Sequence, residues 1–369
     1  MSFLLSFLKK IKFATEIEHG EGAEEPAVTS YIGCYESLKF VFLKSLETPT
    51  RGALGKSDIQ IIIDAMNVAI ERNFPVLLYL NSAGAKLDEG VAIQASFRRL
   101  IRKAIELNMS ESKFIVLMGP NVFGGASMLS MCGNCRVYEE NTKIAMTGSK
   151  VLSQHNGSTT SRVNDLISSS SRAKEDDSAY FIDQDVQLGQ IIDFELSTSK
   201  NFRTHSNRSL AKLSLKNQNR PARIHIDKNT IRCNGTEPPT ISELITLIDY
   251  IERFDKGESY VIECQWTSHS LDLNDECLLQ SKWLVDLAIC LRKKSLSDCR
   301  ITTLVMSSIS GGLYIALAAG SDFIKVQPGA EVLSLPTSVV NLIKTSAIDS
   351  DNAKKSVAQL IDLGVIDSI

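Results

Sequence analysis

The stretch Phe123-Gly124-Gly125-Ala126-Ser127-Met128-Leu129 decides how this chain is expected to fold. It follows an apolar run, 114–118, and opens a segment of small and apolar residues that is typical of a helix. A strand, a glycine pair and a helix in succession aim backbone N–H groups at one point, where the helix dipole favours negative charge. Glycine lets a ligand oxygen approach the backbone closely. The stretch therefore predicts an anion-stabilising turn, although a single glycine pair is also typical of tight packing.

The same unit occurs a second time, at Ser310-Gly311-Gly312-Leu313-Tyr314-Ile315-Ala316. Upstream of each glycine pair lies a buried-strand pattern, 75–82 in the first half and 259–264 in the second, and an amphipathic helix pattern follows each strand. We predict that 60–150 and 245–335 are two copies of one strand–helix–strand–Gly-Gly–helix unit. A repeat on this scale indicates two homologous domains.

The composition agrees with two domains. A chain of 369 residues is too long for one ordinary core. Its formal charge of −3 gives no sign of a nucleic-acid-binding surface. The 8 cysteines show no short-spaced disulfide framework, which favours a reducing cytoplasm. Cys132 and Cys135 form a CxxC without a second ligand pair nearby, so we interpret them as buried helical thiols and not as a zinc site.

The polar stretches divide the chain. Residues 1–30 read as a terminal segment and linker, whose apolar start precedes its lysines and is too short to span a bilayer. A packing or partner-docking helix and membrane association both remain open for residues 1–13. Domains are expected at 31–196 and 221–369, joined by a Ser/Asn/Lys-rich linker at 197–220.

Within the domains, helical patterns cover 37–46 and 56–72. The serine-rich stretch 153–171 predicts a mobile loop, either an active-site lid or a solvated insertion. In the second half, alternating isoleucines over 224–231 predict a hairpin, and Thr240 is placed to cap a helix. Alternating buried strands and helices call for an α/β fold with parallel strand pairing.

At this point the residues resemble a known family. The run Asn81-Ser82-Ala83-Gly84-Ala85-Lys86-Leu87-Asp88-Glu89-Gly90, with Val122-Phe123-Gly124-Gly125 after it, resembles the amino-terminal domain of acyl-CoA carboxyltransferases. It resembles more closely the β subunit of biotin-independent malonate decarboxylase. The stretch from Leu273 to Leu291, with Ser310-Gly311-Gly312 after it, is similar to the decarboxylase γ subunit. The resemblance covers roughly 31–345. It implies two tandem crotonase-type (ββα superhelix) domains, one β-like and one γ-like, in one chain.

The resemblance implies an oxyanion hole at each glycine pair. Gly311 and Gly312 would hold the thioester oxygen as it becomes an enolate, and each such donor is worth roughly 2.7–4 kcal/mol. Gly124 and Gly125 would hold the departing carboxylate, or biotin in a carboxyltransferase. His269 follows the second-half strand and could give a proton to the enolate, or it could be a solvated loop histidine.

Further residues are candidates for substrate binding. Lys86 stands where the family usually carries an arginine, so it could pair with a carboxylate or remain a surface lysine. Arg98 and Arg102 lie on a basic helix face, which could be merely solvated or could receive an acidic carrier protein or a phosphopantetheine phosphate. The other candidates lie in the loops next to the glycine pairs: Ser82, Gly84, Ala85, Phe123 and Ser310.

The function expected from this resemblance is decarboxylation of a malonyl or substituted malonyl thioester, bound to an acyl carrier protein or to coenzyme A. No metal and no cofactor are expected beyond the phosphopantetheine thioester of the substrate. A homo-oligomer or a multienzyme complex is expected, without nucleic acid and without a membrane span. One alternative is a carboxyltransferase that needs a separate biotinyl partner. Another is a catalytically degenerate scaffold subunit of a synthase complex.

Overall fold

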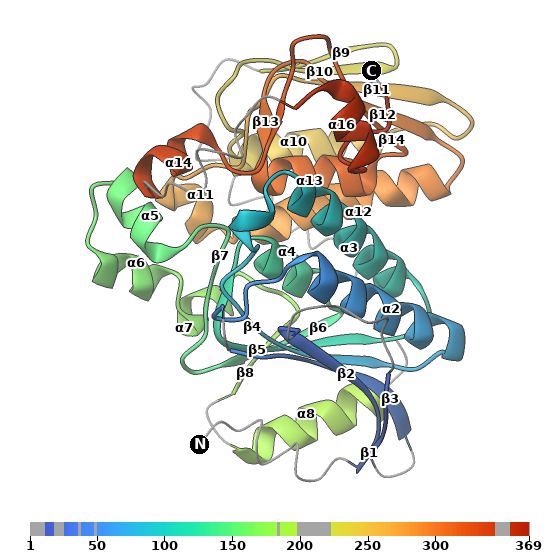
Figure 1. Ribbon diagram of the computed structural model, residues 1–369, viewed down its shortest axis with the longest axis vertical. Helices are drawn as coiled ribbons and strands as arrows, with labels where there is room; N and C mark the ends of the chain where they lie inside the picture. The colour runs from blue at the N-terminus through green and yellow to red at the C-terminus, as the bar shows by residue number, and fades with distance from the viewer. Residues whose placement is uncertain are drawn as a thin grey trace.

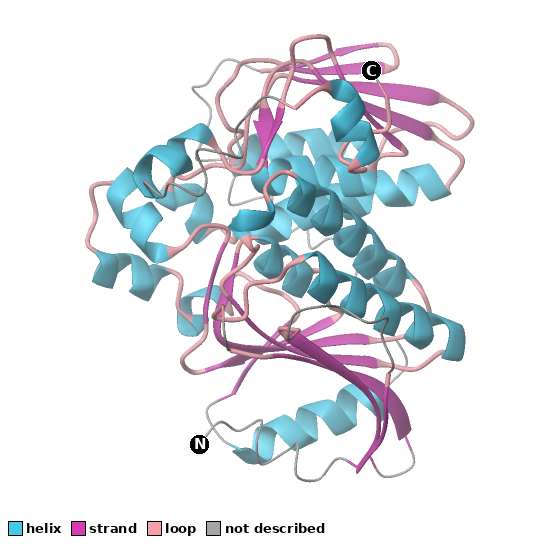
Figure 2. Ribbon diagram, viewed as in Figure 1, coloured by secondary structure: helices cyan, strands magenta, loops and turns pink. Residues whose placement is uncertain are grey.

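Two β-sheets lie at opposite ends of the molecule, and helices fill the space between them (Figures 1 and 2). The computed structural model describes residues 12–17, 26–35, 38–47, 50–182, 185–197, 223–343 and 355–368. The predicted terminal helix over residues 1–13 lies outside this part of the chain, apart from its last two residues in strand β1. The predicted linker lies outside it apart from residue 197.

The first sheet has the strand order β1-β2-β3-β4-β5-β6-β8, and β7 pairs with the end of β5. Strands β1 to β3 are antiparallel, whereas the pairs from β3 to β8 are parallel. The strands are β1 (Lys12–Glu16), β2 (Val28–Tyr35), β3 (Leu38–Ser45), β4 (Val76–Ser82), β5 (Phe114–Phe123), β6 (Cys135–Glu139), β7 (Lys143–Ala145) and β8 (Ala179–Ile182). The helices of this half are α2 (Lys56–Arg72), η1 (Leu87–Glu89), α3 (Ala92–Met109), α4 (Gly125–Met131), α5 (Ser149–His155), α6 (Thr160–Leu166), α7 (Ser169–Arg172) and α8 (Asp185–Ser197).

The helix predicted over 37–46 is wrong, because this segment is strand β3. Phe40 and Phe42 belong to the core cluster on one side of the sheet, and Val41 and Leu43 belong to the cluster on the other. A strand that is buried on both faces shows no polar–apolar alternation in the sequence. The run of aromatic and β-branched residues was the available signal.

The second sheet has the order β14-β12-β11-β10-β9, and its pairs are parallel except for the β9–β10 hairpin. This hairpin was predicted, as was the cap of α10, where Thr240 and Glu243 form a capping box. The strands of this half are β9 (Ile224–Asp227), β10 (Thr230–Cys233), β11 (Ser259–Cys264), β12 (Arg300–Val305), β13 (Ile309–Ser310), β14 (Phe323–Val326) and β15 (Val332–Leu333), and β13 and β15 form a separate two-stranded sheet. The helices are α10 (Ile241–Ile251), α11 (Leu273–Cys277), α12 (Gln280–Leu296), α13 (Gly311–Gly320), α14 (Thr337–Ile343) and α16 (Val357–Asp362).

The same order of elements occurs around both glycine pairs. The first half runs β4, α3, β5, α4 and β6, and the second runs β11, α12, β12, α13 and β14. A short parallel pair follows in each, β5 with β7 and β13 with β15. The mixed α/β architecture with parallel sheets is therefore confirmed. That the two halves are copies of one domain stays a prediction.

The serine-rich stretch 153–171 is helical, so the predicted mobile loop is wrong. It carries the end of α5, all of α6 and most of α7. The side chain of Thr159 accepts a hydrogen bond from the Arg162 N–H and caps α6. Val163 and Ile167 are buried. The small polar residues therefore cap short helices whose apolar residues pack inward. No helix in the described ranges has the length and apolarity needed to cross a bilayer.

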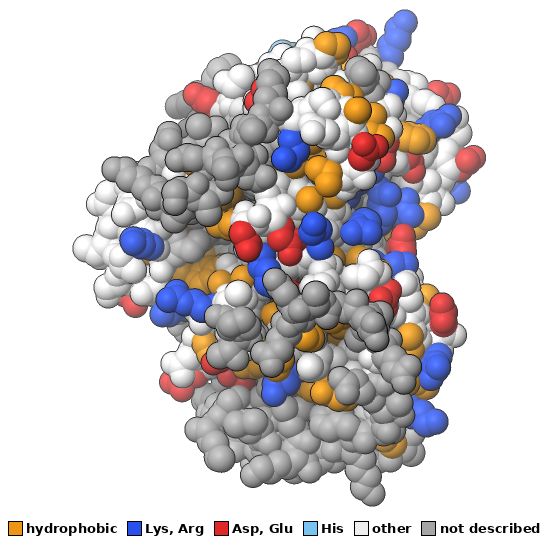
Figure 3. All heavy atoms as spheres, in the orientation of Figure 1, with side chains coloured by type: hydrophobic (Ala, Val, Ile, Leu, Met, Phe, Trp, Pro, Cys, Tyr) orange, Lys and Arg blue, Asp and Glu red, His pale blue; other side chains and the backbone are white. Residues whose placement is uncertain are grey.

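The two halves meet through their helices, α3 against α13 and α4 against α12. Arg102 donates to the carbonyls of Ala319 at 3.0 Å, Ala318 at 2.9 Å and Ser321 at 2.5 Å, at the carboxyl end of α13. Arg98 is buried, donates to Ala318 and pairs with Asp367 at 2.6 Å. Both interpretations of these arginines, a solvated face and a carrier-docking face, are therefore wrong. Basic and acidic side chains lie side by side where the halves meet (Figure 3).

We predict that Arg102→Met destabilises the protein by about 2–4 kcal/mol, because carbonyls at the end of α13 lose a charged donor. Urea unfolding measures the difference. The control is Arg99→Met, three positions away, since Arg99 is exposed and its replacement should change the free energy of unfolding by less than about 0.5 kcal/mol. Equal stability of the two variants would contradict this role for Arg102.

Candidate active site

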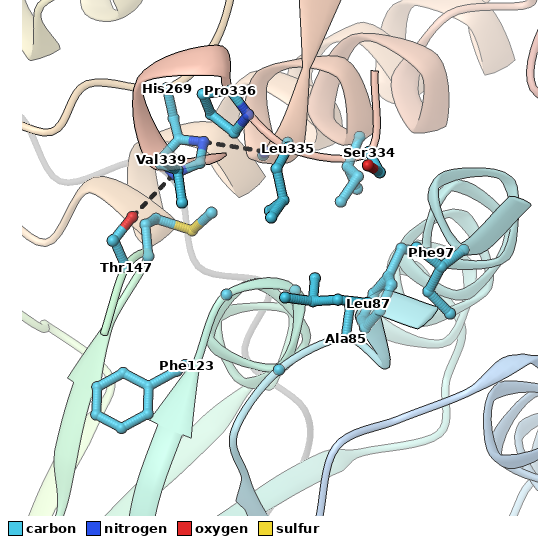
Figure 4. Close-up of a pocket in the computed structure, with 18 of the residues that line it drawn as sticks. Ala85, Leu87, Phe97, Phe123, Thr147, His269, Ser334, Leu335, Pro336 and Val339 are labelled. Atoms are coloured by element: carbon cyan, nitrogen blue, oxygen red, sulfur yellow. Dashed lines mark hydrogen bonds between the residues drawn. The ribbon is translucent and has the colours of Figure 1, made fainter. Parts of the chain in front are cut away.

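Both glycine pairs line one cavity of about 270 Å³ between the two halves (Figure 4). Its wall is built from the loop after β4, the start of α3, the starts of α4 and α13, and the segments that follow β7, β11 and β15. The predicted site residues that line it are Gly84, Ala85, Phe123, Gly124, Gly125, His269, Gly311 and Gly312. The fold therefore brings together residues from both halves, and their catalytic roles stay predictions.

In the first glycine unit, two stretches of backbone approach each other closely. A Cβ added at Gly124 would lie 3.7 Å from the Cα of Gly84, and Gly124 has φ +59°. The Gly124 N–H donates to the Ala145 carbonyl at 3.1 Å, so it is not available to a ligand. Gly125 begins α4, where helix geometry leaves the first amides without intrahelical acceptors. The Ala85 N–H also has no acceptor in the described part of the chain. Ala85 and Gly125 are thus the candidate donors of this unit.

In the second glycine unit, a histidine side chain accepts the hydrogen bond of the amide that was predicted to bind a ligand. The Gly312 N–H donates to His269 Nδ1 at 3.2 Å. A Cβ added at Gly311 would lie only 2.8 Å from the same nitrogen, so the imidazole ring packs directly against the glycine pair. The prediction that Gly312 offers a free oxyanion donor is therefore wrong for this structure. The sequence could not indicate this contact, because the two residues lie on separate segments.

His269 is buried, with 6% of its surface exposed, so a solvated loop histidine is excluded. Burial lowers the pKa of His269 to about 4, which leaves the ring uncharged at neutral pH. Its Nε2 lies 3.1 Å from Thr147 Oγ1 (Figure 4). Because Nδ1 accepts from Gly312, the single ring proton is assigned to Nε2, which then donates to Thr147. A neutral ring whose proton is already shared is a poor acid for an enolate.

Several residues of the site were not predicted. Thr147 lines the cavity, and the preceding Met146 N–H donates to Glu276 at 3.1 Å. Glu276 pairs with Arg172 at 3.3 Å, and each is only 1% exposed. Burial raises the pKa of Glu276, while Arg172 opposes that shift. Arg172 belongs to α7 and Glu276 to α11, so the pair joins the two halves beside the cavity.

Gln94 was also missed, although a lone amide on an apolar helix face was an available signal. It lines the cavity and is 4% exposed. Its Nε2 donates to the Ser334 carbonyl at 2.5 Å, across the junction of the halves. Its Oε1 has no partner within the described residues.

Three predicted substrate-binding side chains point to protein partners instead of the cavity. Lys86 forms an ion pair with the buried Asp58 at 3.5 Å, so its assignment to a substrate carboxylate is wrong. Ser82 Oγ accepts from the Gly84 N–H at 3.1 Å and shapes the loop. Ser310 Oγ lies 3.3 Å from the Thr267 carbonyl. The sequence showed their place in the loops but not the direction of their side chains.

The described lining of the cavity carries no charged side chain. None of its lining residues is Asp, Glu, Lys or Arg. The apolar part is formed by Leu87, Ile93, Phe97, Ile315, Leu335 and Val339. In such a low-dielectric site, neutral donors act strongly on a charge that forms next to them. An isolated ionised group brought in from water meets a large desolvation cost.

The cysteines offer no chemistry at this site. Cys132 ends α4 and Cys135 begins β6, so only one of the two predicted helical thiols lies at a helix. Burial raises the pKa of the Cys132 thiol far above its usual value, which keeps it protonated. Across the described ranges, no group of three His, Cys, Asp or Glu side chains is arranged to hold a metal ion.

The fold and cavity define an α/β protein whose site lies between two halves, and part of the chain is similar to a known family. Residues 27–191 match the carboxyl transferase domain family. The β subunit of the acetyl-coenzyme A carboxylase carboxyl transferase of Agrobacterium fabrum is 25% identical over 135 residues, 36% of this chain and 44% of that protein. The Mesorhizobium japonicum β subunit is 26% identical over 134 residues, 35% of this chain and 42% of that protein. The predicted resemblance to carboxyltransferases is confirmed over residues 27–191.

The match spans less than half the length of these curated relatives. Among solved structures, a Pseudomonas malonate decarboxylase hetero-tetramer in complex with malonate gives a TM-score of 0.47 at 17% identity, over 53% of this chain and 77% of that chain. Transcarboxylase 12S gives a TM-score of 0.43 at 14% identity, over 93% of this chain and 78% of that chain. Structural similarity at these TM-scores and identities does not establish the activity of this chain.

We predict that His269 makes the protein less stable in acid. Its pKa is about 4 in the folded protein, against an ordinary value of 6.5, so the unfolded chain binds more protons between these limits. The free energy of unfolding should therefore fall by up to about 3 kcal/mol as the pH is lowered from 6.5 towards 4. Urea unfolding at several pH values should show this loss in the wild type and a smaller one in His269→Gln.

The control is His155→Gln, because His155 is exposed. This variant should keep the pH dependence of the wild type. If His269→Gln and the wild type lost stability equally over the acidic range between the two pKa values, the assignment of a buried neutral His269 would be wrong.

Proposed function

We propose that this protein decarboxylates a malonyl or substituted malonyl thioester. The bond between the carboxylate and the α-carbon breaks, CO2 leaves, and the bonding electrons form an enolate whose charge rests on the thioester oxygen. A proton from solvent then adds to the carbon and gives the acyl thioester. The observation that carries the proposal is that Ala85 and Gly125 line the cavity with amides that have no acceptor among the described residues, while the Gly312 amide is occupied by His269.

A single set of donors suits decarboxylation better than carboxyl transfer. In a decarboxylation, charge develops on one oxygen, that of the thioester. In a transfer from a carboxylated carrier, a second oxygen, on the carrier, also gains charge as the carboxyl group leaves it. Preset donors are needed wherever such charge develops. The Ala85 and Gly125 amides can serve one oxygen, and the Gly312 amide is taken by His269.

Among the described residues of the cavity lining none is charged, which supports the same reaction. A carboxylate held there loses its water and gains no cationic partner, so its charged form is disfavoured. Departure as CO2 moves the charge to the thioester oxygen, where the amides lie. Apolar lining residues such as Ile315 and Leu335 are of the kind that would pack against an α-substituent on the malonyl group.

The runner-up is a carboxyltransferase that works with a separate biotinyl partner, and the carboxyl transferase domain at 27–191 favours it. In the proposed reaction neither biotin nor a metal ion takes part. The substrate would be a coenzyme A thioester or a phosphopantetheine thioester on an acyl carrier protein. We also propose that the two halves are tandem crotonase-type domains and that the chain works as a homo-oligomer or within a multienzyme complex.

The test is to incubate the protein with malonyl and methylmalonyl thioesters, on coenzyme A and on carrier protein, and to follow the loss of CO2 by mass spectrometry. Acyl thioester should form with no biotinyl protein present, and neither avidin nor a chelator should slow it. Carboxyl transfer that depends on an added biotinyl domain, with no decarboxylation alone, would establish the runner-up instead.

We predict that Ala85→Pro lowers the decarboxylation rate about 10²–10³-fold, because proline lacks the amide donor. The neighbouring bonds of this loop use the Gly84 carbonyl and the Lys86 N–H, which the change keeps. The control is Ala85→Ser, which keeps the amide and should stay within about threefold of the wild type. Thermal melting checks that both variants fold. A folded Ala85→Pro enzyme with normal turnover would remove Ala85 from the oxyanion site.

A further inference from the structure

We propose that the hydroxyl of Thr147 is a further donor to the substrate's thioester oxygen, and that His269 positions it. This inference rests on the proposed function and adds a side chain to a site otherwise made of backbone amides. The proton of Thr147 stays on its oxygen throughout, so no covalent step is involved. The hydrogen bond strengthens as the oxygen gains charge, which is when it contributes to the rate.

The first step of the argument is the direction of the hydrogen bonds at His269. The Gly312 amide can only donate, so His269 Nδ1, 3.2 Å away, must accept. A neutral imidazole has one N–H, which therefore lies on Nε2. Nε2 is 3.1 Å from Thr147 Oγ1, so Thr147 is the acceptor of that bond.

The second step is what remains for the Thr147 hydroxyl. Since its oxygen accepts from His269, its own proton must point elsewhere. No other partner of Oγ1 occurs within the described residues. Thr147 lines the cavity and is only 8% exposed. The acceptor for the hydrogen of this hydroxyl is therefore a ligand oxygen in the cavity.

The third step is that the backbone of Thr147 is held from the second half. The amide of the residue before it, Met146, donates to Glu276 Oε2 at 3.1 Å. Glu276 is fixed in turn by Arg172, which donates to both its carboxylate and its carbonyl. Thr147 is thus placed by a buried ion pair at its backbone and by His269 at its side chain. These contacts at both the backbone and the side chain favour one fixed orientation of the Thr147 hydroxyl.

The test compares Thr147→Val, which removes the hydroxyl at nearly constant volume, with Thr147→Ser, which keeps it. On malonyl-coenzyme A, Thr147→Val should lower kcat about 10- to 100-fold and change KM less than about threefold. Thr147→Ser should recover to within about fivefold of the wild type. A wild-type kcat in Thr147→Val, or an equal loss in both variants, would overturn the role of the hydroxyl.

A second measurement needs no variant and no turnover. The ¹⁵N chemical shifts of the His269 ring in the wild-type protein should show the proton on Nε2 at pH 7. A proton on Nδ1 would overturn the inference, because Thr147 would then donate to His269 and not to a ligand.

Binding separates this inference from the proposed function. Should the wild type release no CO2 from any malonyl thioester, the proposed function is wrong, and acetyl-coenzyme A is then the probe for Thr147. Calorimetry should show it binding about threefold to tenfold more weakly to Thr147→Val than to Thr147→Ser. Equal affinities of the two variants, or no binding to the wild type, would overturn the donor role independently of turnover.

Discussion

The hydrogen bond from the Gly312 amide to His269 Nδ1 is the interaction on which the site depends. It occupies the start of α13, so one of two similar glycine units is closed to a ligand oxygen. It also decides which ring nitrogen carries the proton and hence what Thr147 in the other half can do. The bond requires an uncharged ring, because a protonated Nδ1 would face the amide hydrogen. Burial, which lowers the pKa of His269 to about 4, therefore maintains the arrangement at neutral pH.

The same helix is fixed at its other end by the first half. Arg102 on α3 donates to carbonyls at the carboxyl end of α13, where cations are favoured and helix geometry leaves acceptors unpaired. Because α13 meets His269 at one end and Arg102 at the other, it cannot shift along its axis without losing one set of contacts. The geometry of the cavity therefore follows from the packing of the two halves, and neither half contains the site alone.

The sequence predicted the parts of this structure that local pattern determines. Strand, glycine pair and helix were assigned correctly in both halves, and the loops that line the cavity were placed near them. Long-range contacts were not predictable. Lys86 and Arg102 looked like ligands for a substrate or carrier because their partners, Asp58 and the end of α13, are remote in sequence. Strand β3 was mistaken for a helix because both of its faces are buried.

An uncharged cavity is well suited to chemistry that moves a charge. A fixed cation would bind the substrate carboxylate and stabilise the ground state as well as the transition state, which does not raise kcat. The neutral donors proposed at Ala85, Gly125 and Thr147 gain most when charge reaches an oxygen beside them. In the proposed reaction, an apolar wall disfavours the carboxylate before the bond breaks and accommodates neutral CO2 afterwards. The uncharged described lining and the occupied Gly312 amide are thus both consistent with the proposed decarboxylation, in which negative charge moves to an oxygen beside neutral donors.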